Sequence, residues 1–181
     1  MSQPTLEEMK ALLLEHEWAE RNGDLDGTMA TLVAHPVFEV HPQGLRIEGY
    51  EAVREMYGRL LPGSNDPLSE GTAQTERVLQ SSITASGNSV LCTEVQHEMR
   101  RPDGTAACVR MLVNVYFQDG KLFGERLFSD NDMAELINSA LGPDFINLPG
   151  VTTIVDDYPH NPGARPGEPA VPVATPSGRA P

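Results

Sequence analysis

A run of long segments that are joined by short turn sequences constrains the fold of this chain more than any other feature. The pattern predicts three or four long strands, over 74–85, 89–100, 105–117 and 121–129. The connecting sequences are typical of hairpin turns: Ser86-Gly87-Asn88, Pro102-Asp103-Gly104 and Asp119-Gly120. Consecutive hairpins form an antiparallel sheet, and strands of about 9–13 residues exceed the usual five or six. Long strands favour a strongly curved sheet whose concave side other elements must cover.

Helical periodicity precedes and follows the predicted strands. The first helix is predicted over 5–21, where Thr5 is a plausible N-cap with Glu8 three residues later. Further helices and two short strands are predicted: helices over 25–33, 50–61 and 131–141, strands over 37–41 and 45–47. Helices grouped before a run of hairpins are an α+β pattern. We therefore expect a curved antiparallel sheet that forms a cone closed by three N-terminal helices, with a fourth helix at the C-terminal end.

The composition changes near residue 148. The stretch from Pro143 onward holds nine of the fifteen prolines, together with Gly, Ala and Ser, and shows almost no periodicity. Such a sequence buries too little apolar surface to offset the entropy of ordering it. We therefore expect one domain over 4–147 and a Pro/Gly/Ala-rich flexible tail over 148–181. The apolar segment 151–155 could add a strand to a sheet edge or dock on a neighbouring surface.

The charge balance limits the class of partner. The formal net charge is −13, from 26 acidic and 13 basic side chains. Nucleic acids and anionic membranes both attract basic surfaces, so we expect neither as a partner. No apolar run approaches the length of a bilayer span and no signal segment opens the chain, which favours a cytoplasmic location. Cys92 and Cys108 lack the paired spacing and neighbouring ligands of a zinc site, and we expect no metal and no cofactor.

The Asp119-Gly120 turn predicts which side chains of the last hairpin share a face. It pairs Gln118 with Lys121. The inward face then carries two rows: Val109, Met111, Val113, Val115 and Phe117, and Leu122, Gly124, Arg126, Phe128 and Asp130. The preceding strand leaves two interpretations open, because a slip of one residue exchanges its faces. Either His97 points inward with apolar neighbours, which we favour, or Glu94 and Gln96 do.

Two groups of short motifs occur in a fixed order along the chain. The first group is Asn22-Gly23-Asp24-Leu25-Asp26-Gly27, Val37-Phe38-Glu39-Val40-His41-Pro42 and Gly49 to Tyr57. The second is Gly120-Lys121-Leu122 followed by Glu125-Arg126-Leu127-Phe128-Ser129-Asp130. In order and spacing they resemble the steroid ketoisomerases and SnoaL-like polyketide cyclases of the nuclear-transport-factor-two-like (NTF2-like) superfamily. The resemblance covers most of residues 6–141 and implies a cone fold, a cavity for a small molecule and a homodimer.

The same resemblance suggests where chemistry would occur. His41 stands where the isomerases place their proton-shuttling Asp, and His16 stands near the helical Tyr that donates to the enolate oxygen. Val113 stands near a protonated Asp that supplies the second donor. Loss of one such donor costs about 3 kcal/mol of transition-state stabilisation, so steroid isomerisation by that mechanism is not expected. Asp130 matches the acid/base Asp that SnoaL-like cyclases and related epoxide hydrolases place between the last strand and the last helix.

Together these features predict a cofactor-independent acid/base enzyme of the isomerase, cyclase, dehydratase or epoxide hydrolase type. Its substrate would be a small apolar carbonyl or polycyclic compound. His41 would move the proton, Asp130 would orient it or act as the complementary acid/base, and Arg126 with His97 would polarise an oxygen. Further substrate-binding candidates are His16, Trp18, Tyr57, Met111, Val113 and Phe128.

Structural roles compete with each of these functional roles. Asp130 also stands where a helix N-cap is needed, and Arg126 could form a structural ion pair with Asp130 or Glu94. The alternative prediction is therefore a non-catalytic small-molecule-binding or dimerisation module of the same fold.

Overall fold

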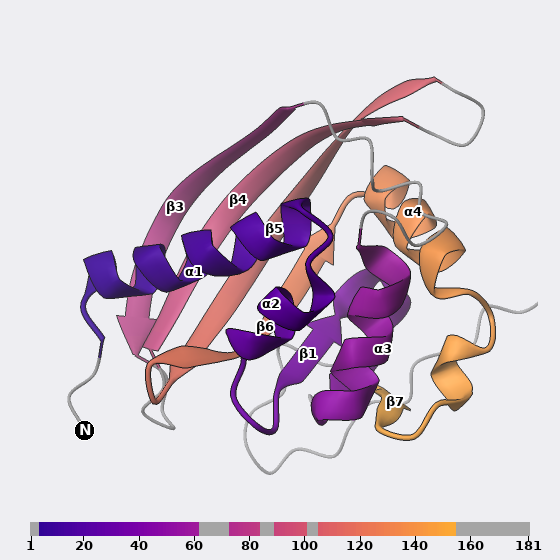
Figure 1. Cartoon of the computed structure of the whole chain (residues 1–181). Coiled ribbons are helices and arrows are strands. Elements are labelled where there is room, and N and C mark those ends of the chain that lie inside the picture. The colour runs from indigo at the N-terminus through magenta and orange to yellow at the C-terminus, as the bar shows by residue number, and fades with distance from the viewer. Residues whose placement is uncertain (1–3, 62–72, 84–88, 101–104, 155–181) are drawn as a thin grey trace, which may run out of the picture.

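A seven-stranded sheet forms one layer of the structure, in the order β3-β4-β5-β6-β1-β2-β7. Its long strands are β3 (Ala73–Ile83), β4 (Ser89–Arg100), β5 (Ala106–Gln118) and β6 (Lys121–Ser129). The short strands are β1 (Val37–Val40), β2 (Leu45–Glu48) and β7 (Val151–Thr153). Neighbouring strands run antiparallel except β1 and β6, which are parallel. The computed structural model describes residues 4–61, 73–83, 89–100 and 105–154, and Figure 1 shows the pronounced curvature of the long strands.

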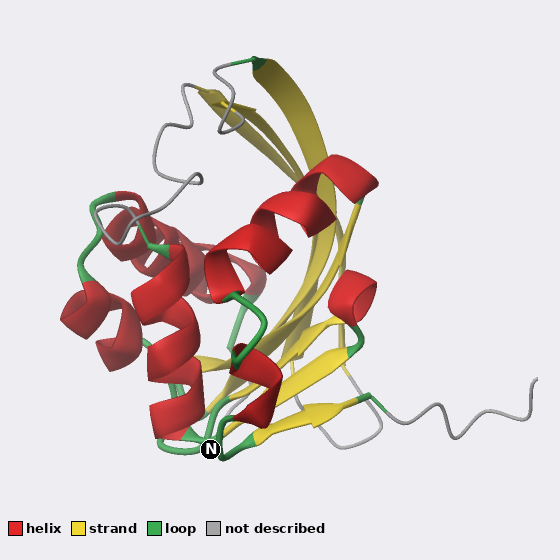
Figure 2. Ribbon diagram, turned by 90° about the vertical axis from the view of Figure 1, so that its right-hand side faces the viewer, coloured by secondary structure: helices red, strands yellow, loops and turns green. Residues whose placement is uncertain are grey.

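Helices gather on one face of this sheet (Figure 2). The helices are α1 (Leu6–Arg21), α2 (Leu25–Ala30), α3 (Tyr50–Leu60) and α4 (Asn131–Leu141), with short 3-10 turns η1 (His41–Gln43) and η3 (Phe145–Asn147). The predicted capping box begins α1, since the Thr5 hydroxyl accepts from Glu8 N and the Glu8 carboxylate accepts from Thr5 N. Helix α1 crosses the concave side of the long strands (Figure 1). The predicted α+β class, with a curved sheet covered by three N-terminal helices, is confirmed.

Apolar side chains of the sheet's inner face and of the helices form one core. The long strands β4, β5 and β6 contribute these buried residues to it: Leu91, Val95, Val109, Met111, Val113, Val115, Phe117 and Leu122. In β4, Leu91, Thr93 and Val95 are buried whereas Glu94 and Gln96 are only half-buried. This confirms the favoured register of that strand where its side chains are described. The backbone of His97 pairs with Val109, but the His97 side chain lies outside the described part, as do the two earlier predicted turns.

A β-bulge in β6 reverses the face of every later side chain in that strand. Pairing starts as predicted with Gln118 and Lys121, but it then moves from Phe117–Leu122 to Tyr116–Gly124 and leaves Phe123 as an extra residue. The predicted inward placement of three residues is therefore wrong: Arg126, Phe128 and Asp130. Instead, Glu125 and Leu127 lie opposite the inward-facing residues Val115 and Val113 of β5.

The sheet extends past the expected domain boundary at residue 147. Phe145 of η3 is buried, and β7 pairs antiparallel with β2 at the edge of the sheet. The strand that the apolar segment 151–155 could form is thus present over Val151–Thr153. Within the described residues, no helix combines the length and apolar character required to cross a bilayer.

Candidate functional site

A buried histidine lies at the centre of a polar cluster between the helices and the sheet. His16, on α1, is 0% exposed. Its Nε2 lies 2.9 Å from the hydroxyl of Tyr57 on α3 and 3.0 Å from Oε1 of Glu20, one helical turn along α1. Its Nδ1 lies 2.6 Å from Oγ1 of Thr31, which follows α2. Three helical segments therefore meet at one imidazole ring.

The surroundings shift the proton affinities of this cluster. Burial alone lowers the pKa of His16, but the carboxylates of Glu20, Glu125 and Glu17 outweigh it and raise this pKa above its ordinary value. Burial raises the pKa of Tyr57 well above its ordinary value, and the charges of Glu20 and Glu125 add to that rise. The arrangement therefore favours an imidazolium ring and an un-ionised phenol. Glu125 acts on both groups because the bulge in β6 turns it inward.

The members of the cluster differ in their exposure to solvent. His16 and Tyr57 are buried, whereas the side chain of Glu20 is 30% exposed. A molecule that approaches from solvent would therefore meet the Glu20 carboxylate before either ring. Groups with perturbed proton affinity that surround an accessible carboxylate are typical of acid/base sites.

Only part of this cluster was predicted from the sequence. His16 and Tyr57 were predicted and lie together. Glu20 was missed, although its position four residues after His16 places both on one face of α1. Met111 and Val113, also predicted, are buried on the inner face of β5. Trp18 was expected in the cavity wall, but it is 62% exposed on α1 and lies away from the buried ring.

Four other predicted residues lie on the outer side of the sheet or at its margin: His41, Arg126, Phe128 and Asp130. The His41 ring stacks on Phe128, with centroids 4.0 Å apart. Arg126 pairs with Glu39 at 2.8 Å, and Arg46 binds the same carboxylate at 2.9 Å. Phe38 and Val40 are buried while His41 follows the alternation outward, so the expectation that His41 enters the cone is corrected.

Asp130 occupies the N-cap of α4. Its Oδ1 accepts from Met133 N at 3.0 Å and its Oδ2 accepts from Arg110 N at 2.8 Å. Both carboxylate oxygens therefore bind backbone amides, one at the start of α4 and one in β5. The structural role that the sequence suggested for Asp130, a helix cap, accounts for this geometry.

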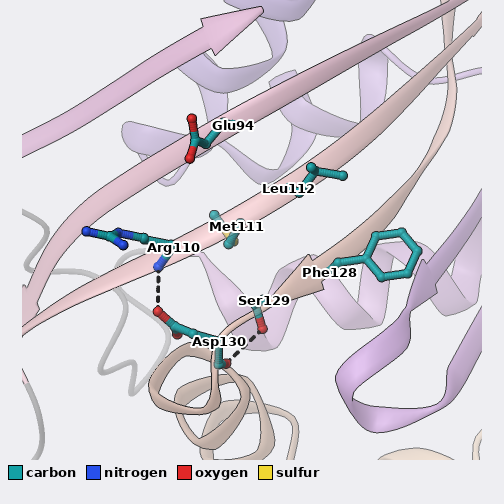
Figure 3. A pocket seen from close by; sticks show the side chains of 7 residues that line it. All are labelled: Glu94, Arg110, Met111, Leu112, Phe128, Ser129 and Asp130. Carbon is teal, nitrogen blue, oxygen red and sulfur yellow. Dashed lines mark hydrogen bonds between the residues drawn. The ribbon is translucent and has the colours of Figure 1, made fainter. Parts of the chain in front are cut away.

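An open pocket of about 340 Å³ lies on the outer face beside Asp130. Its lining residues, drawn in Figure 3, are Glu94, Arg110, Met111, Leu112, Phe128, Ser129 and Asp130. Glu94, Leu112 and Phe128 are neighbours across β4, β5 and β6. Leu112 and Phe128 are 38% and 40% exposed. The pocket thus has an apolar floor, and the Asp130 carboxylate at its margin is already engaged by backbone amides.

Comparison with known proteins identifies the fold. No family model matches the sequence and no curated protein is similar to it. A Mycobacterium tuberculosis protein of unknown function, Rv3472, superposes with a TM-score of 0.58 at 16% identity, over 82% of this chain and 92% of that chain. A putative isomerase from Bacillus subtilis gives 0.54 at 18% identity, over 75% and 94% of the two chains. A putative SnoaL-like polyketide cyclase from Shewanella denitrificans gives 0.50 at 11%, over 75% and 99%. Similarity at these identities shows the fold alone.

Proposed function

We propose that this chain, which has the NTF2-like fold of SnoaL-like and ketosteroid isomerase-like proteins, is a cofactor-independent acid/base enzyme. The observation that carries the proposal is the buried ring of His16, held within 3.0 Å of both a carboxylate and a phenol in the interior of the fold. Burial of such groups is costly unless they are paired, and clusters of this kind concentrate at functional sites. The proposal moves the proton-transfer role from His41 and Asp130 to the cluster around His16.

Glu20 is the member of the cluster that we propose contacts the substrate. Its carboxylate would take a proton from a carbon beside a carbonyl group and return it to another atom of the same molecule. His16 and Tyr57 lie behind Glu20 and would fix its orientation through the 3.0 Å contact with His16 Nε2. The apolar side chains that surround the cluster on the inner side of the sheet suit a small, largely apolar carbonyl or polycyclic compound as the substrate.

Exchange of carbon-bound protons for deuterium tests this proposal even when the product of the reaction is unidentified. Small cyclic ketones and polycyclic phenols would be incubated with the protein in D₂O and followed by NMR. We expect the wild type to accelerate exchange in at least one compound and Glu20→Gln to reduce that rate about a hundredfold, because general bases contribute on this scale. The matched control is Glu15→Gln, an exposed carboxylate on the same helix. Equal rates for wild type and Glu20→Gln would rule out the proposed role.

A second proposal, homodimer formation, is supported by the outer face of the sheet. Leu112 and Phe128 are exposed neighbours there, with Arg110 on one side of the pair and the ion pair of Arg126 with Glu39 on the other. A two-fold interface requires a patch that complements itself, and a mixed patch around an apolar centre meets that requirement.

Light scattering tests the homodimer directly. We expect about twice the chain mass of 19.7 kDa for the wild type and a monomer for Phe128→Lys, because a buried lysine opposes assembly. Trp18→Lys is the matched control, since Trp18 is another exposed aromatic residue, located on α1. A monomeric wild type, or equal behaviour of the two variants, would remove this interface from consideration.

A further inference from the structure

Thr31 is the contact of His16 on the side of the ring away from Glu20. Its Oγ1 lies 2.6 Å from His16 Nδ1 and 2.6 Å from the carbonyl oxygen of Thr28. A hydroxyl has one hydrogen to donate, and a backbone carbonyl can only accept. The Thr31 hydroxyl therefore donates to Thr28 O, and its oxygen accepts from His16. It follows that Nδ1 of His16 carries a proton.

With a proton on Nδ1, the charge of the ring depends on whether Nε2 carries a lone pair or a second proton. In a neutral ring the second nitrogen carries a lone pair. Here that lone pair would face a Glu20 oxygen at 3.0 Å, which is repulsive when the carboxylate is ionised. A second proton on Nε2 converts the contact into a charge-assisted hydrogen bond. The Tyr57 hydroxyl, 2.9 Å from Nε2, can both donate and accept and so tolerates either state.

We propose that Thr31 is a positioning residue that fixes the ring of His16 so that Nε2 carries a proton toward Glu20. This inference rests on the proposed function, because it concerns the group that orients the Glu20 carboxylate. Thr31 acts only through His16, and its anchor Thr28 belongs to α2. The protonation of the site is thereby linked to the packing of α2 against α1.

Other charged or titratable groups also lie around the ring of His16, and a test of Thr31 must leave them unchanged. Glu20 and Glu17 act from α1, Tyr57 from α3 and Glu125 from β6. None of them is altered by a substitution at Thr31. A change in the titration of His16 after such a substitution therefore reports on the Nδ1 contact itself.

The test is an NMR titration of the His16 ring nitrogens in the full chain. The variants are Thr31→Val, which removes the hydroxyl at nearly constant shape, and Thr31→Ser, which retains it. We expect Thr31→Val to weaken proton binding by His16 about fivefold, the equivalent of one net hydrogen bond. Thr31→Ser should stay within about twofold of the wild type, because its hydroxyl retains the contact.

Thr28→Val is the matched control. It also removes a hydroxyl from a buried threonine, but that hydroxyl donates to Asp24 O at 2.8 Å, and the Thr28 carbonyl that accepts from Thr31 remains. We expect Thr28→Val to leave the titration midpoint of His16 unchanged. Equal midpoints for Thr31→Val and wild type would overturn the role of Thr31 and leave that of Glu20 intact. A wild-type midpoint at or below the ordinary value of about 6.5 would instead remove the charged pair on which the proposed function depends.

Discussion

Replacement of Gly124 by alanine is expected to lower the free energy of unfolding by about 3–5 kcal/mol, the range of severe backbone and packing defects. Gly124 follows the bulge in β6 and has a φ of +151°, a conformation that L-residues rarely adopt. A Cβ at this position would overlap the carbonyl oxygen of Val37 in β1. That oxygen is backbone, so relief would require β1 to move away from β6 and would weaken their parallel pairing. Urea denaturation of the variant measures the loss.

Gly120→Ala separates the clash from the cost of an unusual φ. Gly120 has a φ of +76° in the hairpin turn before β6, but a Cβ there would have no heavy atom within 4 Å. We expect a loss of about 1 kcal/mol, the cost of a left-handed conformation alone. Equal losses at the two positions would contradict the inference that close approach of β1 requires a glycine in β6.

The same bulge marks the limit of what the sequence could predict. Alternation and turn residues were sufficient for the strands, their pairing at Gln118–Lys121 and the α+β class, because these features depend on local chemistry. One extra residue, Phe123, turns the residues that follow it in β6 to the opposite face of the sheet. Because Leu122 and Phe123 are both apolar, the alternation of polar and apolar residues does not reveal this change. Gly124 is the sequence feature that indicates the bulge, since a glycine within a strand often accompanies one.

The candidate site was accessible to sequence reasoning only where its members share a helix. Glu20 follows His16 by one helical turn, so a search for polar residues on one face of α1 would have paired them. Thr31 and Tyr57 reach the ring from separate elements, and their positions depend on how α2 and α3 pack. The inward position of Glu125 depends on the bulge in β6 as well. Long-range contacts of this kind follow from tertiary packing and have no local pattern.

The second large effect is expected from His16→Ala, which should lower the free energy of unfolding by about 3–4 kcal/mol near pH 6. The substitution leaves a cavity in a fully buried position and removes a shared partner of Tyr57 and Thr31. His35→Ala is the matched control, because His35 is exposed and its loss should cost less than about 0.5 kcal/mol. Thermal or urea unfolding of the three proteins measures the difference.

The pH dependence of that difference tests the charged state of His16. Because nearby carboxylates raise the pKa of the folded-state ring, the folded protein binds its proton more tightly than the unfolded chain does. The resulting stabilisation is fully present below the unfolded pKa of about 6.5 and is lost as the pH rises through the folded value. The gap between wild type and His16→Ala should therefore be largest between about pH 5 and 6.5 and should narrow toward pH 9. A gap that is constant or widens over this range would mean that the ring is buried in its neutral form, and that Glu20 is held by Tyr57 rather than by an imidazolium.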